Sequence, residues 1–224
     1  MAYRDVLLDS DAIIGACQKK ALVSKEEPIR ALCIGGGAGS EILAFASLTK
    51  EILVDLGIGL HVTAVDVADW SDLLQEMGSL VNTRLPLDRS AFQLDFKHED
   101  FLDTYSDFDL AQTDIITLLF TTNELFAASK PKTLGLLAHL SATCKTGAIL
   151  LVAESAGSYS EIKVGDMTYP LELILDQTLV GKDKVWKVEE KDAGRWYRVS
   201  EQTKKQYALQ IENTHMLIRV YRKV

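Results

Sequence analysis

A glycine-rich loop is the feature that most constrains the fold of this chain. Its glycines are Gly35, Gly36, Gly37 and Gly39. An apolar run at residues 29–34 precedes the loop, and helical periodicity at residues 41–48 follows it. Glycines without a Cβ let a ligand approach the backbone, and the free N–H groups of the helix start favour an anion. The order of strand, glycine loop and helix predicts an open parallel sheet with its ligand at the carboxyl ends of the strands.

The rest of the first two thirds of the chain fits such a sheet. Three more short apolar runs, at residues 60–67, 114–120 and 147–153, and a further strand candidate at residues 92–96 alternate with helical patterns at residues 70–80 and 133–144. Strands that are apolar throughout are typical of a parallel sheet covered on both faces. Residues 3–21 also have helical spacing, and Ser10 or Asp11 can cap a second helix there. We therefore predict an α/β fold.

After Gly157 the pattern changes. Pro170 can begin a helix that continues to residue 177, and residues 185–188 and 216–221 are predicted as two β segments with the sequence Arg-Trp-Tyr-Arg (residues 195–198) between them. Their alternation of apolar and charged residues favours antiparallel or edge strands. The 224 residues suit one domain with three parts: an N-terminal helical segment (1–28), a cofactor-binding core (29–157) and a substrate-side portion (158–224).

Composition excludes several classes of protein. Three cysteines without a C-x-x-C pair argue against a disulfide framework or a cysteine-rich zinc site. The four histidines are scattered without metal-ligand spacing, so we expect no metal. No apolar run approaches the ~20 residues of a membrane helix, and the first residues lack the pattern of a signal peptide. We expect an intracellular protein that does not enter a membrane.

The spacing of the glycines separates two kinds of cofactor. In the dinucleotide pattern G-x-G-x-x-G/A, Ser40 would stand at the third glycine, and the acid that ends the next strand, Asp66, is 31 residues after Gly35 rather than about 20. The alternating glycines instead resemble the G-x-G-x-G loop of class I methyltransferases, which bind S-adenosylmethionine (SAM). That family usually has an acid two residues before the first glycine, where this chain has Cys33.

The resemblance to class I methyltransferases implies roles for further residues. The acid that ends the second strand binds the ribose hydroxyls, which implies this role for Asp66; the alternative is a solvated acid at a strand end. Asp100 and Phe101 resemble the acid-plus-apolar pair that holds the adenine, although other acids lie nearby. Phe120 begins the loop after the fourth strand, which lies beside the transferable methyl group. The resemblance also implies a Rossmann-like, mostly parallel seven-stranded sheet with helices on both faces and an antiparallel C-terminal edge.

Four segments narrow the resemblance: LLFTTNELF (118–126), YPLELILDQTL (169–179), RWYR (195–198) and IENTHMLIRVYR (211–222). They are similar to a fungal methyltransferase family that modifies N3 of a uridine in large-subunit (25S) ribosomal RNA. The likeness covers most of residues 30–222. It implies SAM as cofactor, ribosomal RNA or a pre-ribosome as partner, and the nucleolus or cytoplasm as location.

Uridine N3 must lose its proton to become a good nucleophile, so a base or donors to the base carbonyls would help. Glu124 is the first candidate for the base, and Asn123 can hydrogen-bond a carbonyl; the alternative is a helix capped by Asn123 with Glu124 in its first turn. Tyr159 and Trp196 could stack on an unpaired base. The alternative for Trp196 is a core or edge-strand aromatic.

The charge of the chain is unevenly distributed. Residues 1–181 carry 13 Lys and Arg against 26 Asp and Glu, whereas residues 182–224 carry 11 against six. Arg195 and Arg198 belong to this basic segment, where they could contact RNA or line a solvated face. Three hypotheses stay open: the ribosomal RNA methyltransferase, a SAM-dependent methyltransferase of a protein or small molecule, and a catalytically silent SAM-binding scaffold.

Overall fold

The computed structural model describes residues 2–24, 26–36, 39–85, 87, 91–157, 160–181, 185–205, 210 and 212–224. Seven strands form one sheet, and two more form a separate hairpin. The strands are β1 (Ile29–Ile34), β2 (Leu60–Asp66), β3 (Phe92–His98), β4 (Ile115–Leu119), β5 (Ile149–Ser155), β6 (Glu161–Val164), β7 (Met167–Pro170), β8 (Trp186–Tyr197) and β9 (Thr214–Lys223).

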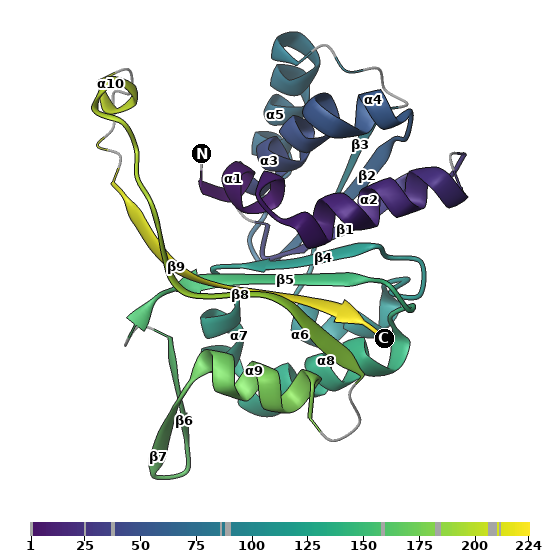
Figure 1. The fold of residues 1–224 in the computed structure, drawn as a ribbon. Helices are drawn as coiled ribbons and strands as arrows, with labels where there is room; N and C mark the ends of the chain where they lie inside the picture. The colour runs from purple at the N-terminus through teal and green to yellow at the C-terminus, as the bar shows by residue number, and fades with distance from the viewer. Residues whose placement is uncertain are drawn as a thin grey trace.

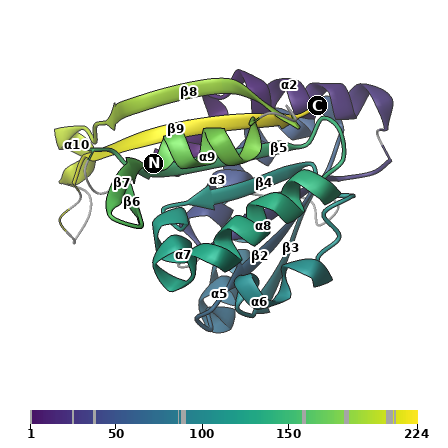
Figure 2. The same ribbon diagram turned by 90° about the horizontal axis from the view of Figure 1, so that it is seen from below.

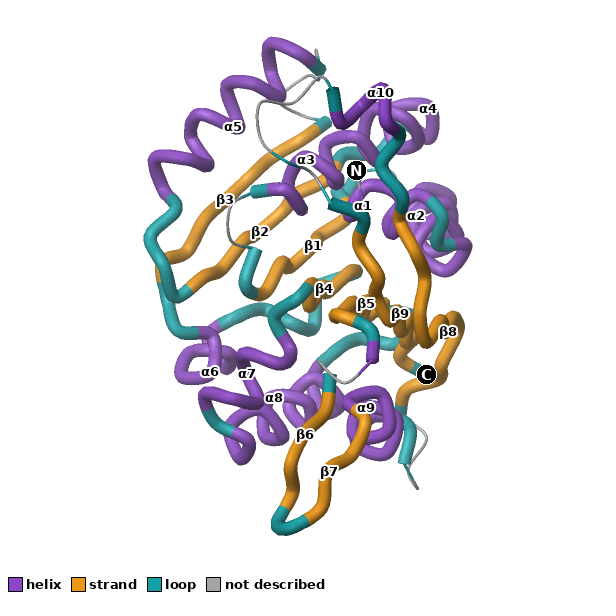
Figure 3. The backbone as a smooth tube through the Cα atoms, turned by 90° about the vertical axis from the view of Figure 1, so that its left-hand side faces the viewer, coloured by secondary structure: helices purple, strands orange, loops and turns teal. Residues whose placement is uncertain are grey.

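The main sheet has the order β3-β2-β1-β4-β5-β9-β8. Its first five strands are parallel, β9 is antiparallel to β5, and β8 is antiparallel to β9. Figure 3 shows the strands following one another across the sheet, with the β6–β7 hairpin projecting below it. This arrangement confirms the predicted mostly parallel seven-stranded sheet with an antiparallel C-terminal edge. The strand order reverses between β1 and β4, which creates a topological switch point there.

Helices cover both faces of the sheet, as predicted (Figures 1 and 2). One face carries α1, α2 and α3, and the other carries α8 and α9. The helices are α1 (Ala2–Leu8), α2 (Asp11–Val23), α3 (Ser40–Leu48), the π-helix η1 (Thr49–Leu53), α4 (Val54–Leu56), α5 (Ser71–Arg84), α6 (Phe101–Thr104), the 3₁₀-helix η2 (Tyr105–Asp107), α7 (Thr122–Ala128), α8 (Lys130–Thr143), α9 (Leu171–Leu179) and α10 (Glu201–Lys204).

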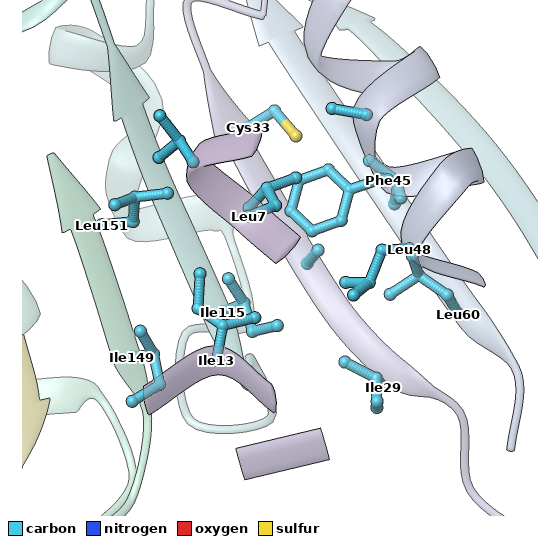
Figure 4. Close-up of a cluster of buried hydrophobic side chains, with 14 of the residues drawn as sticks. Leu7, Ile13, Ile29, Cys33, Phe45, Leu48, Leu60, Ile115, Ile149 and Leu151 are labelled. Carbon is cyan, nitrogen blue, oxygen red and sulfur yellow. The ribbon is translucent and has the colours of Figure 1, made fainter. Parts of the chain in front are cut away.

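The alternation of side chains in the strands divides the core into two clusters. In β1, Ala31 and Cys33 pack on the side of α1, α2 and α3, whereas Leu32 and Ile34 pack on the side of α8 and α9. Figure 4 shows the first cluster, where Phe45 of α3 lies over the strands. Successive residues of a strand point to opposite faces, so a strand buried on both sides must be apolar throughout. The apolar runs in the sequence reflect this double burial.

The N-terminal prediction is confirmed in detail, and the C-terminal one is partly wrong. Ser10 caps α2, because its side chain accepts a hydrogen bond from the N–H of Ile13 at 3.3 Å. The segment at residues 195–198 does not lie between two strands: its first three residues form the end of β8, a single strand of 12 residues. Two register shifts in the β8–β9 ladder interrupt the alternation of inward and outward side chains along β8. The sequence pattern therefore did not show that β8 is one long strand.

The sequence did not predict the β6–β7 hairpin, whose strands have only four residues each. Among the helices that the structure describes, none has the length and apolar character that crossing a membrane requires.

Candidate functional site

The glycine loop lies at the switch point, at the carboxyl ends of β1 and β4. Gly35 has a φ of +71°, which an L side chain rarely adopts, and a Cβ at this position would collide with the side chain of Thr121 at the end of β4. The N–H of Gly35 also donates to the carbonyl of Val65 in β2 at 2.9 Å. The loop therefore brings its backbone close to two neighbouring strands, which only a glycine permits.

The second half of the loop starts α3. Gly39 is the N-cap of this helix with a φ of +77°, and a Cβ there would collide with Met77 of α5. Gly36 lies over β1, where an added Cβ would be 3.2 Å from the Cβ of Cys33. Gly37 lies outside the described residues. The three described glycines thus have steric reasons for their identity, and they leave backbone rather than side chains at the switch point.

The acid predicted for the ribose ends β2, beside the glycine loop in the sheet. The carboxylate of Asp66 accepts a hydrogen bond from the N–H of Ala68 at 2.8 Å, which fixes the turn after the strand. Because β2 is the neighbour of β1, Asp66 is placed at the same edge as the loop. The role at the ribose stays a prediction, and the position agrees with it.

The pair predicted for the adenine has structural partners. The carboxylate of Asp100 caps α6 by accepting a hydrogen bond from the N–H of Leu102 at 3.0 Å. Phe101 is 4% exposed and packs edge-on against Phe108, with ring centroids 4.8 Å apart. These contacts account for both residue types without a ligand.

Phe120, at the start of the loop after β4, has an unusual backbone. Among the described residues other than glycine, it alone has a positive φ, of 59°. Its ring packs edge-on against Tyr3 of α1, with centroids 5.9 Å apart. Strained backbone of this kind costs about 1–3 kcal/mol and persists where the surroundings enforce it, often at functional sites. The first helix of the chain therefore closes over the candidate site at this point.

A buried carboxylate organises the loop after β4. Glu154 of β5 is 2% exposed, and its two oxygens accept from the backbone N–H and the side-chain amide of Asn123, both at 3.0 Å. The same amide also donates to Ser160 at 3.1 Å. Burial raises the pKa of Glu154 above its usual range, although the hydrogen bonds from α7 oppose this. Asn123 thus lies inside α7 and does not cap it, because the N-cap is Thr121.

Glu124, the predicted base, occupies the first turn of α7 and is exposed to solvent. Its charge is close enough to Glu154 to raise the pKa of that group. The two carboxyl groups therefore differ in environment: Glu154 is buried and hydrogen-bonded, whereas Glu124 faces the surface. The sequence alone could not assign these two environments.

The segment at residues 195–198 lies at the same edge of the sheet as the glycine loop. Ser155 ends β5, pairs with Met216 of β9, and Met216 in turn pairs with Arg195 of β8. Trp196 is thus placed beyond the carboxyl end of β5. Figure 1 shows the far ends of β8 and β9 extending past the sheet with α10, on the side of the N-terminus. The structure brings this segment to the candidate site although it is more than 150 residues from the glycines in the sequence.

The side chain of Trp196 in this segment is exposed and stacks on a second ring. Trp196 is 53% exposed, and its ring lies parallel to that of His215, with centroids 4.4 Å apart and an angle of 9°. Trp196 is therefore an aromatic of the edge strand β8 and not of the core. Arg195 donates to the carboxylate of Asp192 at 3.0 Å and to the hydroxyl of Tyr197 at 3.3 Å. Arg198 is exposed, and Tyr159 lies outside the described residues.

The sequence prediction missed Glu41. This residue follows the glycine loop in the first turn of α3, yet it is 3% exposed. Burial raises its pKa from 4.5 to about 7, against hydrogen bonds from the side chains of Thr117 and Cys33 that lower it. Among the residues that the structure describes, none donates a hydrogen bond to its oxygen Oε1. No sequence pattern predicts the burial of Glu41, because an acid in the first turn of a helix is ordinarily exposed to solvent.

A cavity of about 460 Å³ lies at the opposite edge of the sheet, between α2 and the starts of β1, β4 and β5. Two of its ammonium groups, those of Lys20 and Lys145, pair with the carboxylate of Asp114 at 3.2 and 2.7 Å. Ligands of such sheets bind at the carboxyl ends of the strands, so this cavity is not the candidate site.

The residues at the switch point fit a nucleoside cofactor that carries a cation. Gly35 and Gly39 carry no side chain, so a ligand can approach the loop backbone, although Thr121 and Met77 occupy the places that a Cβ would take. The unpartnered oxygen of Glu41 lies at the same place and suits a positively charged group rather than an anion. SAM has both a nucleoside and two positive charges. The acids at this edge argue against a simple anion-binding loop.

Comparisons with known proteins agree with this site. Residues 1–222 match the family described as "Putative SAM-dependent methyltransferase". The 25S rRNA (uridine(2843)-N(3))-methyltransferase of Saccharomyces cerevisiae is 33% identical over 218 residues, which cover 85% of this chain and 59% of that protein. The chain therefore spans about three fifths of the length of this curated relative.

Solved structures share the fold at low sequence identity. A S-adenosylmethionine-dependent methyltransferase from Clostridium acetobutylicum has a TM-score of 0.51 at 11% identity, over 98% of this chain and 95% of that one. The N-methyltransferase NodS from Bradyrhizobium japonicum, in complex with S-adenosylhomocysteine, has a TM-score of 0.50 at 12% identity, over 97% and 90%. With the family match over nearly its whole length, this chain belongs to the SAM-dependent methyltransferases of that family.

Proposed function

We propose that this chain transfers the methyl group of SAM to N3 of a uridine in large-subunit ribosomal RNA. The observation that carries the proposal is the 33% identity to a yeast protein whose name states this reaction. The chain covers 59% of that relative, so the substrate is inferred and not carried over with the family. The arrangement of the candidate site supports the proposal, because it places an exposed aromatic stack at the edge of the sheet where the cofactor binds.

The residues around the switch point would hold the cofactor. Gly35, Gly36, Gly37 and Gly39 offer backbone to it, Asp66 binds the ribose hydroxyls, and Asp100 with Phe101 borders the adenine. Phe120 lies beside the reacting end. Bound SAM supplies a methyl group on a positively charged sulfur, which is reactive without further activation. The work left to the protein is alignment of the nucleophile and removal of its proton.

The proton of uridine N3 goes to Glu124 in this mechanism. Its carboxylate is exposed on α7, so a substrate can reach it. The lone pair left on N3 would then take up the methyl group that bound SAM supplies, and S-adenosylhomocysteine would be left. Asn123 acts as a positioning residue, because its amide holds Glu154 and thereby the start of α7.

The substrate base must leave its stack, since N3 lies on the pairing edge of uridine. The exposed ring of Trp196, which stacks on His215, offers a flat face on which such a base can stack. Arg198 is available to a phosphate, whereas Arg195 is held by Asp192 and Tyr197 and would orient the strand. Tyr159, which lies outside the described residues, stays a proposed second aromatic for the base.

The charges of the chain favour a structured partner over naked RNA. Residues 182–224 are basic, but the whole chain has a net charge of −8. Phosphate contacts need Lys and Arg, so this chain alone would bind RNA weakly. A pre-ribosome in the nucleolus or cytoplasm is therefore the proposed partner. In this proposal, residues 1–224 act as one methyltransferase domain, with residues 158–224 on the substrate side.

A transfer assay tests the proposal. The purified chain is incubated with SAM carrying a labelled methyl group and with large ribosomal subunits from cells that lack the gene, and the RNA is digested to nucleosides for mass spectrometry. The proposal expects label in 3-methyluridine. Subunits from cells that have the gene serve as the control, because their target is already methylated. Label in protein instead of RNA would favour a protein methyltransferase and contradict the proposal.

A further inference from the structure

Glu41 differs from other acids that begin helices in this chain. Asp72 in α5 and Glu124 in α7 also lie in first turns, and both are exposed to solvent. An acid at this position helps a helix through its dipole, and that benefit does not require burial. Glu41 is instead 3% exposed, between α3 and the sheet. The position at the start of α3 therefore explains why residue 41 is an acid, but it does not explain why Glu41 is buried.

The neighbours of the Glu41 carboxyl group place it over the switch point. Its side-chain partners, Cys33 of β1 and Thr117 of β4, are directly paired in the sheet. Cys33 is the position where class I methyltransferases usually have an acid, so the carboxyl group of Glu41 reaches the place that this chain leaves without one. Tyr3 of α1 lies on the other side and is close enough for the charge of Glu41 to raise its pKa.

The carboxyl group lacks a positive partner. Among the residues that the structure describes, none forms an ion pair with Glu41, and Oε1 accepts no hydrogen bond. A buried carboxylate without a cation is costly, and proteins rarely keep one without a use. A ligand that brings a cation with N–H donors to this place would satisfy both the charge and the open oxygen.

SAM brings such a group, because its amino-acid end carries an ammonium with three donors. We propose that the carboxylate of Glu41 is the counter-ion of this ammonium group and takes the place of the acid that is absent at Cys33. The inference rests on the proposed function, since it requires SAM at the switch point. Glu41 thus gives α3 an ion pair with the cofactor. The glycine loop cannot provide this contact, because its backbone N–H groups repel a cation.

A pair of ligands isolates the ammonium group. S-adenosylhomocysteine and its desamino analogue, in which hydrogen replaces the amino group, differ only there, and calorimetry measures the Kd of each. Glu41→Gln keeps the shape of the side chain and removes its charge. We expect this variant to bind S-adenosylhomocysteine ~10-fold more weakly, the typical effect of a lost charged hydrogen bond, while the Kd of the desamino analogue stays unchanged. Glu76→Gln, the same change on the exposed side of α5, should alter neither Kd.

Three outcomes are decisive. An equal loss for both ligands would show that Glu41 only supports the loop, and unchanged binding of both would show that it is not needed; either overturns the inference. Wild-type protein that binds neither ligand would overturn the proposed function and the inference with it.

A second measurement needs no variant and stays valid if Glu41→Gln does not fold. Below pH 7 the free carboxyl group is largely protonated, so pairing with an ammonium must release a proton. Calorimetry in buffers of different ionisation enthalpy counts that proton. Tyr3 and Cys33 face the same group, and burial raises their pKa values further above neutrality, so they stay protonated. Any proton that Glu154 releases or takes up is expected to be the same for both ligands and cancels in the comparison. We expect proton release with S-adenosylhomocysteine and less with the desamino analogue; equal release would overturn the inference.

Discussion

The burial of Glu41 predicts a specific dependence of stability on pH. Its pKa is 4.5 in a solvated chain and about 7 in the folded protein, because burial disfavours the charged form. Between these two values the folded state keeps a proton that the unfolded state has lost. Stability therefore falls as the pH rises from 4.5 to 7, and the loss is complete above 7. The difference in pKa corresponds to about 3 kcal/mol.

Glu41→Gln removes this titration and leaves the other groups in place. Denaturant unfolding of the two proteins at a series of pH values gives the free energy of unfolding of each. We expect the variant to gain about 3 kcal/mol relative to the wild type between about pH 4.5 and pH 8. Other titrating groups cancel in the difference. A difference that stays flat with pH would refute the reasoning, because Glu41 would then have the same pKa in both states.

Three further predictions concern the site. Gly35→Ala should destabilise the protein by roughly 1–3 kcal/mol and weaken binding of S-adenosylhomocysteine, because its Cβ meets Thr121 at a positive φ; Gly147→Ala, also at a positive φ but in open space, should leave binding unchanged in calorimetry. Trp196→Ala should weaken binding of ribosomal RNA by about 1–3 kcal/mol in a gel-shift or filter assay and leave the affinity for S-adenosylhomocysteine intact. Glu124→Gln should slow single-turnover transfer by roughly 10²-fold or more without changing cofactor affinity, and an unchanged rate would remove this residue from the mechanism.

The sequence predicted the centre of the sheet well because strands such as β1, β4 and β5 are buried on both sides. Apolar runs such as residues 29–34 and 60–67 leave few alternatives, and the observed strands β1 and β2 agree with them to within a residue. The glycine loop was equally informative, since positive φ values at Gly35 and Gly39 need this residue type. Both features depend on residues that are close together in the sequence, so the sequence alone was enough to predict them.

Features that depend on distant contacts could not be predicted. The environment of Glu41 depends on Cys33 and Thr117 in two strands, and the stack of Trp196 depends on His215 from another strand. Residues 195–198 were placed between strands because the bulges of β8 break its alternation. In each case the sequence shows the residue type, and the fold decides its environment.

The central claim, methylation of a ribosomal uridine at N3, is tested most directly in the RNA of cells with and without the gene. A methyl group at N3 blocks base pairing, so reverse transcription stops one nucleotide before the modified base. Primer extension along the whole large-subunit RNA is predicted to show one strong stop at a uridine that disappears when the gene is deleted. It should return with wild-type protein and not with Glu124→Gln. An unchanged pattern of stops in the deletion strain would contradict the account.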